Sequence, residues 1–201
     1  MVRDGVLRDV IRFFVDRAAS RGLTRTRLVK LVFLADYETY RARRQTLTGL
    51  EYVMDRMGPL AWGIPDTAGG MLSDGVTQTV GDSVFGGREY RYTAITGDSD
   101  SYMLLSADDL AVLRDVWRRF GRQSARRIVD TVHEMPFVQL FSPGDSVDFR
   151  LALSDPKDRA RISAWKRLRP KVPAKRSQDE GAQLMSALHT MRHGEEAAFL
   201  P

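Results

Sequence analysis

Apolar residues in the first part of the chain recur every three or four positions, which is the period of one face of a helix. One such stripe spans residues 7–18 and a second spans residues 28–35. Gly22 between them is typical of a helix C-terminus, and Thr24 is typical of the residue that caps the start of a helix. The pattern therefore predicts two consecutive helices, the second of which frays at the basic run 41–44.

In the middle of the chain the helical period is lost, and residues 89–95 alternate with the period of two that is typical of a strand. Residues 76–80 and 89–95 are both predicted to be strands, with Gly86-Gly87 as the turn before the second. A short strand is also expected within residues 52–57, and Pro59 suits the first turn of a short helix that follows it. These elements predict a small antiparallel sheet.

The second half of the chain returns to the helical period. Ser106 and Asp109 resemble a capping box, in which the side chain of each residue bonds the backbone amide of the other. The helix that they begin should end at Gly121, where the apolar stripe stops. Ser124 can cap a further helix that ends before Pro136. Two more helices are therefore predicted after the sheet.

The last part of the chain completes the predicted fold. Residues 148–153 are expected to form one more strand, and Ser154 and Ser177 are expected to precede two further helices. We therefore predict an α+β fold, mainly a helical bundle with a small antiparallel β-sheet inserted in the middle. Residues 1–150 should form the main domain, and residues 151–201 a helical C-terminal extension that packs on that domain or continues it.

Composition limits the kind of protein. The 201 residues are 43% hydrophobic and 9% aromatic, so the chain can form a packed core. Because cysteine is absent, disulfides, thiolate zinc sites and a cysteine nucleophile are excluded. The N-terminal segment lacks the apolar region of a signal peptide, and no apolar run approaches the ~18 residues of a membrane span. We therefore expect a soluble cytoplasmic protein that makes no contact with a membrane.

The sequence carries no catalytic signature. The glycine-rich motifs of dinucleotide-binding and P-loop proteins and the GxSxG motif of serine hydrolases are absent. His189 and His193 have the four-residue spacing of a metal pair, but the glutamate of a zincin and a third ligand are missing. Asp66 and Glu89 resemble the carboxylate pair of some nucleases, but Arg91 stands where those enzymes need a lysine. We therefore predict no catalytic residue, no metal and no cofactor.

A basic segment near the C-terminus is the best candidate for nucleic-acid binding. Residues 161–176 contain no acidic residue, and Lys166, Arg167 and Arg169 could neutralise phosphates. The whole chain carries a formal charge of only +5, however, and no recognisable base-reading element accompanies the segment. A solvent-exposed or partner-binding face is therefore an equally open interpretation.

Several short motifs follow one another along the first two thirds of the chain. They are Leu28, Lys30, Leu31, Phe33 and Ala35 on the second helix; Leu47, Thr48 and Glu51; Gly58-Pro59-Leu60; and Thr131-Val132-His133. In this order the motifs resemble the Panacea domain family, the phage-associated antitoxin domain of bacterial toxin–antitoxin systems. The resemblance covers roughly residues 5–140.

The resemblance implies an antitoxin that neutralises a cognate toxin by direct protein–protein binding and is not an enzyme. The toxin would be held in a chaperone-like manner or delivered to a host protease by an adaptor mechanism. The resemblance assigns a shared role in the fold or in partner contact to six family-matched residues. These are Lys30, Tyr37, Glu51, Gly58, Pro59 and His133.

Departures from the family pattern leave the toxin unidentified. Met57 stands where the family has an aromatic residue before Gly-Pro, and the chain beyond Phe141 has no match. The competing hypothesis is a DNA-binding regulatory protein that uses residues 161–176, in which case nucleic acid would be a partner. An enzyme is the third class.

Overall fold

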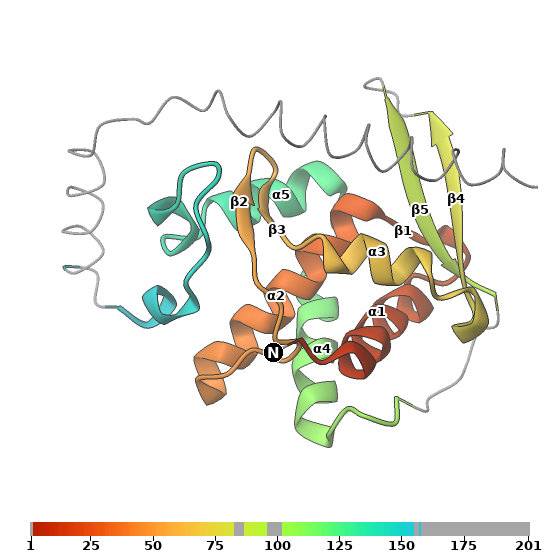
Figure 1. Cartoon of the computed structure of the whole chain (residues 1–201), viewed down its shortest axis with the longest axis horizontal. Coiled ribbons are helices and arrows are strands. Elements are labelled where there is room, and N and C mark those ends of the chain that lie inside the picture. Colours follow the sequence, from red (N-terminus) through yellow and green to blue (C-terminus); the bar gives the residue numbers. More distant parts are fainter. Residues whose placement is uncertain (1, 83–86, 96–101, 155–156, 158–201) are drawn as a thin grey trace, which may run out of the picture. The chain divides into compact units, whose positions relative to one another are not determined.

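The computed structural model describes residues 2–82, 87–95, 102–154 and 157 (Figure 1). Its α-helices there are α1 (Asp4–Ala18), α2 (Arg25–Arg43), α3 (Gly63–Gly69), α4 (Ala107–Phe120) and α5 (Ala125–His133). Its strands are β1 (Leu23–Thr24), β2 (Val53–Asp55), β3 (Gly58–Leu60), β4 (Val76–Asp82) and β5 (Arg88–Ala94). Short 3-10 helices are η1 (Ala19–Arg21), η2 (Leu72–Asp74), η3 (Val138–Leu140) and η4 (Phe149–Leu153). The predicted α+β fold is confirmed.

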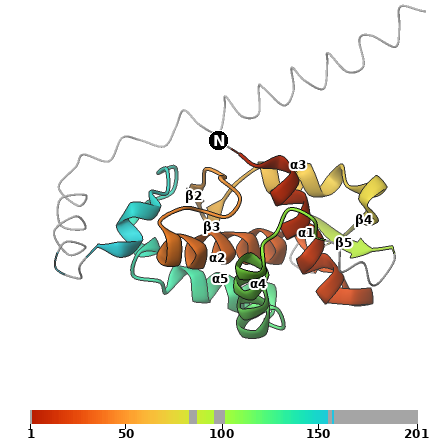
Figure 2. The same ribbon diagram turned by 90° about the horizontal axis from the view of Figure 1, so that it is seen from below.

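Helix α2 is the centre of the fold. Every residue from Leu28 to Asp36 is buried, and the helix packs against α1, α3, α4 and α5. Figure 2 shows α4 and α5 on one side of α2, and the β2–β3 hairpin with α3 on the other. A helix that is covered on several sides is apolar around most of its circumference rather than along one stripe. The buried surface of α2 is therefore wider than the predicted stripe, and it includes two ionisable residues, Lys30 and Asp36.

The predicted caps at the starts of α2, α4 and α5 are confirmed. Thr24 Oγ1 accepts a backbone amide of the first turn of α2 at 3.4 Å, and Ser124 Oγ accepts one of α5 at 3.2 Å. Ser106 and Asp109 form the complete capping box of α4. These side-chain oxygens bind amides that have no partner inside the helix. Gly22 caps the 3-10 helix η1, which continues the chain after α1 ends at Ala18.

The predicted antiparallel sheet is confirmed and has one more strand than expected. β4 and β5 pair with each other and overlap the predicted ranges, although β4 is two residues longer and β5 begins and ends one residue earlier than predicted, and β1 completes the order β1-β5-β4. Leu23 lies opposite Tyr92 on one side, and Gln78 lies opposite Tyr92 on the other. The sequence does not predict β1, because two residues carry no recognisable period. Figure 1 shows β4 and β5 as a ribbon beside the helices, where β5 contacts α1 and β4 contacts α3.

The short strand expected within residues 52–57 is β2, but the expected helix start at Pro59 is wrong. Pro59 lies in β3, opposite Met54 in a separate two-stranded hairpin. Gly58 has a φ of +85°, which glycine adopts readily, and it turns the chain directly before Pro59. A proline is tolerated in β3 because an edge strand does not need every amide for its ladder. The short helix begins later, at Gly63.

The expected strand at residues 148–153 is also wrong, because this segment forms the 3-10 helix η4. Asp148 Oδ1 accepts a backbone amide of η4 at 2.9 Å, so its side chain begins a turn and competes with an extended backbone. Phe149 is buried against Phe33 and Phe137, with ring centroids 5.8 Å apart in each pair. The segment therefore contributes to the core through a turn rather than a strand.

Several predictions lie outside the described residues. They are the helices after Ser154 and Ser177, the basic segment 161–176 and the pair His189 and His193. The domain boundary after residue 150 likewise stays a prediction. Within the part of the chain that the structure describes, no helix is both long and apolar enough to cross a membrane.

Candidate functional site

Four of the six family-matched residues lie together. Lys30 Nζ on α2 donates a hydrogen bond to the carbonyl oxygen of Pro59 in β3, at 2.8 Å. A Cβ built on Gly58 would lie 3.4 Å from Lys30 Nζ and 3.4 Å from His133 Nε2, so the hairpin backbone approaches both side chains. We call these four residues the Lys30 cluster. It joins α2, the β2–β3 hairpin and the end of α5.

Lys30 is an ionisable residue in the interior, with only 2% of its surface exposed. Burial removes water from the ammonium group and lowers the pKa of Lys30 to about 8, while the negative charge of Asp55 acts in the opposite direction. Lys30 is thus still mostly protonated near neutral pH, but it loses its proton more readily than an exposed lysine.

The lowered pKa of Lys30 predicts that stability depends on pH. The unfolded chain holds the proton up to a pH near 10.5 and the folded chain only up to about 8, so folding becomes more favourable as the pH rises between these values. The free energy of unfolding should rise by about 1 kcal/mol between about pH 8.5 and about pH 9.5. Urea denaturation at the two pH values measures this change.

Lys30→Met is the control for this prediction, because it keeps a long side chain without a titrating group. The variant should lack the rise. Any pH dependence that comes from other groups is common to the two proteins, so comparing them removes it. Equal pH slopes in both proteins would show that the fold does not perturb Lys30.

The Lys30 cluster borders an open hollow of about 710 Å³, which we call the Lys30 hollow. Lys30 and Gly58 are among its lining residues, and Val29, Leu60 and Val129 supply apolar surface. Its charged lining residues are of both signs. Apart from Lys30, they are Arg25, Arg88, Arg126, Asp55, Glu89 and Asp130. The hollow therefore offers an apolar surface surrounded by groups that can pair with either charge.

Side chains of types common in protein interfaces lie in this hollow or contact a residue that lines it. The Arg25 guanidinium carbon lies 5.3 Å from the ring centroid of Trp62 and 5.8 Å from that of Tyr90. Trp62 is 61% exposed and Met57 is 49% exposed. Trp, Tyr, Met and Arg are enriched where proteins bind one another. The sequence motifs do not single out Arg25, Trp62 or Tyr90, because the exposure of an aromatic residue depends on packing.

Tyr37 and Glu51 do not line the Lys30 hollow. The ring of Tyr37 stacks on that of Phe137 with centroids 5.5 Å apart, and the Arg41 guanidinium carbon lies 5.6 Å from the Tyr37 ring centroid. Glu51 is exposed and lines a different hollow of about 430 Å³, together with residues of α1 and α3. The six family-matched residues therefore occupy three places in the fold.

A buried acidic residue that the motifs do not single out, Asp36, organises the loop after α2. Asp36 Oδ1 accepts the amide of Thr48 at 2.8 Å, and Oδ2 accepts the hydroxyls of Thr48 at 2.5 Å and Tyr52 at 2.8 Å. Burial raises the pKa of Asp36 to about 6, although hydrogen bonds from Thr48 and Tyr52 act to lower it. Asp36 follows Val32 by four residues, on the predicted apolar face, and this position is its sequence signal.

The other candidate residues form no assembled site. Among the described residues, no group of three or more His, Asp or Glu side chains is placed to hold a metal ion. Glu89 Oε1 accepts a hydrogen bond from Arg91 at 2.6 Å. Lys166, Arg167 and Arg169 lie outside the described residues, so the DNA-binding alternative stays a prediction.

Residues 28–136 match the family model of the antitoxin SocA-like Panacea domain. The chain belongs to this family. The matched region of this Panacea-domain protein contains all six family-matched residues and most residues that line the Lys30 hollow. No curated protein matches the chain in sequence. The resemblance inferred from the motifs is therefore confirmed, and it supports an antitoxin-type role.

Proposed function

We propose that this Panacea-domain protein neutralises a cognate toxin by direct protein–protein binding, with the Lys30 hollow and the adjoining Trp62 as the toxin-binding surface. The observation that carries the proposal is that four family-matched residues lie together and that two of them, Lys30 and Gly58, line one open hollow. Family membership supports the antitoxin role. The position and composition of the Lys30 hollow support its assignment as the toxin-binding surface.

The proposed surface has the composition of a protein-binding site. A partner that covers Trp62 and Met57 removes large apolar side chains from water, which favours binding. Arg25 holds Trp62 and Tyr90 through cation–π contacts, so these rings are positioned before the partner arrives. The charges of both signs around the hollow favour a partner with the complementary pattern and disfavour others.

The Lys30 cluster acts on this surface indirectly. Lys30 is almost fully buried, and its hydrogen bond to Pro59 holds β3 against α2. Gly58 allows the hairpin to approach His133 closely. The hairpin residues Met57 and Leu60, which line the hollow, are thereby fixed in place.

The proposal predicts that Trp62→Ala weakens toxin neutralisation. Wild-type protein, co-expressed with the product of the neighbouring reading frame, should relieve growth arrest and co-purify with that product. Truncation of a central interface tryptophan costs about 2 kcal/mol, or roughly a thirtyfold higher Kd. Titration calorimetry with the purified neighbouring protein measures the Kd, and growth under limiting antitoxin expression measures neutralisation.

Met103→Ala is the matched control, because Met103 is 88% exposed and lines none of the described hollows. It should bind and neutralise as the wild type does. Trp62→Ala should melt at the wild-type temperature, since Trp62 is mostly exposed. An unchanged Kd for Trp62→Ala contradicts the proposed surface. Failure of the wild-type protein to form any complex with the neighbouring product contradicts the proposed function.

The adaptor form of the proposal adds a host protease. In that form, growth rescue disappears in a strain that lacks the protease, while the complex with the toxin still forms. Rescue that persists in that strain supports neutralisation by binding alone.

A further inference from the structure

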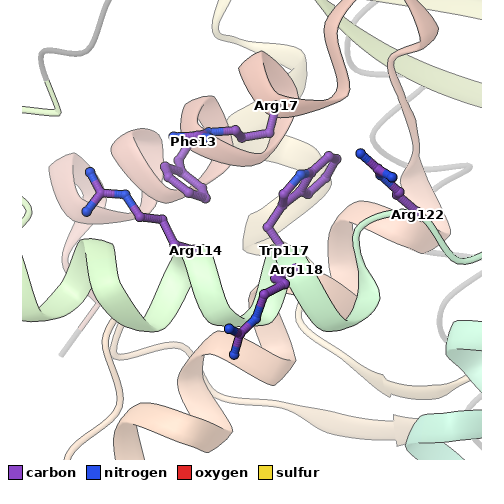
Figure 3. Close-up of a pocket in the computed structure, with 6 residues that line it drawn as sticks. All are labelled: Phe13, Arg17, Arg114, Trp117, Arg118 and Arg122. Atoms are coloured by element: carbon purple, nitrogen blue, oxygen red, sulfur yellow. The ribbon is translucent and has the colours of Figure 1, made fainter.

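A second hollow, between α1 and α4, is lined by four arginines and two aromatic residues (Figure 3). Its volume is about 500 Å³, and we call it the arginine hollow. Arg114 and Arg118 are four residues apart on α4, and Arg122 follows after four more, just beyond the helix end. Phe13 and Arg17 have the same spacing on α1. A spacing of four places side chains on one face of a helix, and the two faces meet at the hollow.

The arginine hollow carries positive charge that the described residues compensate only in part. Arg118 forms an ion pair with Asp115. Arg17, Arg114 and Arg122 form no ion pair within the described ranges. Like charges four residues apart on a helix repel one another. An anionic ligand in the hollow relieves this repulsion.

The floor of the hollow is apolar. The Phe13 side chain is buried, and the Arg17 guanidinium carbon lies 5.2 Å from its ring centroid. The Trp117 indole lies against Gly121, and a Cβ at Gly121 would overlap the indole ring. The ring centroids of Trp117 and Phe14 are 6.5 Å apart. Gly121 therefore covers one face of the indole. Stacking of a nucleic-acid base requires an open aromatic face. An apolar side chain of a protein can instead pack against the part of the Trp117 indole that Gly121 leaves uncovered.

We propose that the arginine hollow binds an acidic segment of a partner protein. Carboxylates of the segment contact Arg17, Arg114 and Arg122, and an apolar side chain of the segment packs against the exposed part of Trp117. Guanidinium groups match carboxylates through paired hydrogen bonds. Duplex DNA offers anions as well, but its bases are stacked inside the double helix and cannot enter the hollow as a protein side chain can. The arginine hollow shares no lining residue with the Lys30 hollow, so this inference goes beyond the proposed function and stands without it.

Fluorescence anisotropy with the full chain tests the proposal. The probe is a short dye-labelled peptide in which glutamates flank a central Leu-Phe pair. The double variant Arg114→Gln/Arg122→Gln should raise the Kd for this peptide at least about tenfold, because two charge-assisted contacts are lost. The control Arg3→Gln/Arg127→Gln removes the same charge from exposed positions that line no described hollow. It should change the Kd less than about twofold.

Two further probes separate the classes of ligand. A peptide with glutamine in place of every glutamate should not bind, and an oligothymidylate of equal charge should bind more weakly than the acidic peptide. Equal losses in the two double variants would overturn the proposal, because binding would then depend on net charge alone. Tighter binding of the oligothymidylate, lost in Arg114→Gln/Arg122→Gln, would overturn it in favour of a nucleic-acid site.

Discussion

Replacing Asp36 with alanine is expected to lower the free energy of unfolding by about 3 kcal/mol. The Asp36 carboxylate accepts three hydrogen bonds from Thr48 and Tyr52 inside the core. Alanine leaves these donors without their acceptor and opens a cavity, and this cost exceeds the gain from removing a buried charge. For a chain of this size the melting temperature should fall by about 6–12 °C. Thermal unfolding followed by circular dichroism measures the change.

Asp36→Asn separates hydrogen bonding from charge. The asparagine carbonyl can accept the Thr48 amide, and its amide group can donate to the hydroxyls of Thr48 and Tyr52, which also act as acceptors. Asparagine removes the buried charge as well, and burial already raises the pKa of Asp36 to about 6. The destabilisation should therefore be less than half of that of Asp36→Ala. Equal melting temperatures for the two variants would contradict the hydrogen-bond explanation.

Features that depend on neighbouring residues could be predicted from the sequence. Thr24, Ser106 and Ser124 cap helices because each side chain reaches an amide only three residues away. The alternation of residues 89–95 in and beside β5 is likewise a local signal, since it is carried by the strand itself. The helical content and the small sheet followed from these signals.

Features that depend on distant residues could not be predicted. Strand β1 forms because Leu23 pairs with Tyr92 of β5. Two residues are too few to show a pattern from which this pairing could be predicted. The residues around Phe149 have the composition of a strand, but they fold as a 3-10 helix because Phe149 packs against Phe33 and Phe137. Pro59 suits a helix start locally, and pairing with Met54 places it in a hairpin instead.

The candidate site likewise contains residues that could be predicted from the sequence and residues that could not. Lys30, Gly58, Pro59 and His133 were identified through the family resemblance, and the structure brings them together across three elements. Trp62 carried no signal, because only packing determines that it is 61% exposed. A surface for binding a partner consists of residues that the fold leaves uncovered, and a single sequence does not reveal which apolar residues those are.

Replacing Gly22 with alanine is expected to destabilise the protein by about 3 kcal/mol. Gly22 has φ +59° and ψ −177°, a combination that is essentially restricted to glycine. A Cβ at this position would lie 2.5 Å from the carbonyl oxygen of Tyr92 and 2.6 Å from Thr93 Oγ1. Both atoms belong to β5, so relief of the overlap must shift the strand that pairs with β1 and β4. The melting temperature should fall by about 6–12 °C.

Gly81→Ala is the matched control for Gly22→Ala. Gly81 lies in β4 of the same sheet, and a Cβ built on it meets no atom within 4 Å. The same chemical change should therefore alter the free energy of unfolding by no more than about 0.5 kcal/mol. Because both substitutions add one methyl group, the difference between them isolates the backbone conformation and the contact with β5. If both variants melted at the wild-type temperature, neither the backbone conformation of Gly22 nor its close approach to β5 would require a glycine at this position.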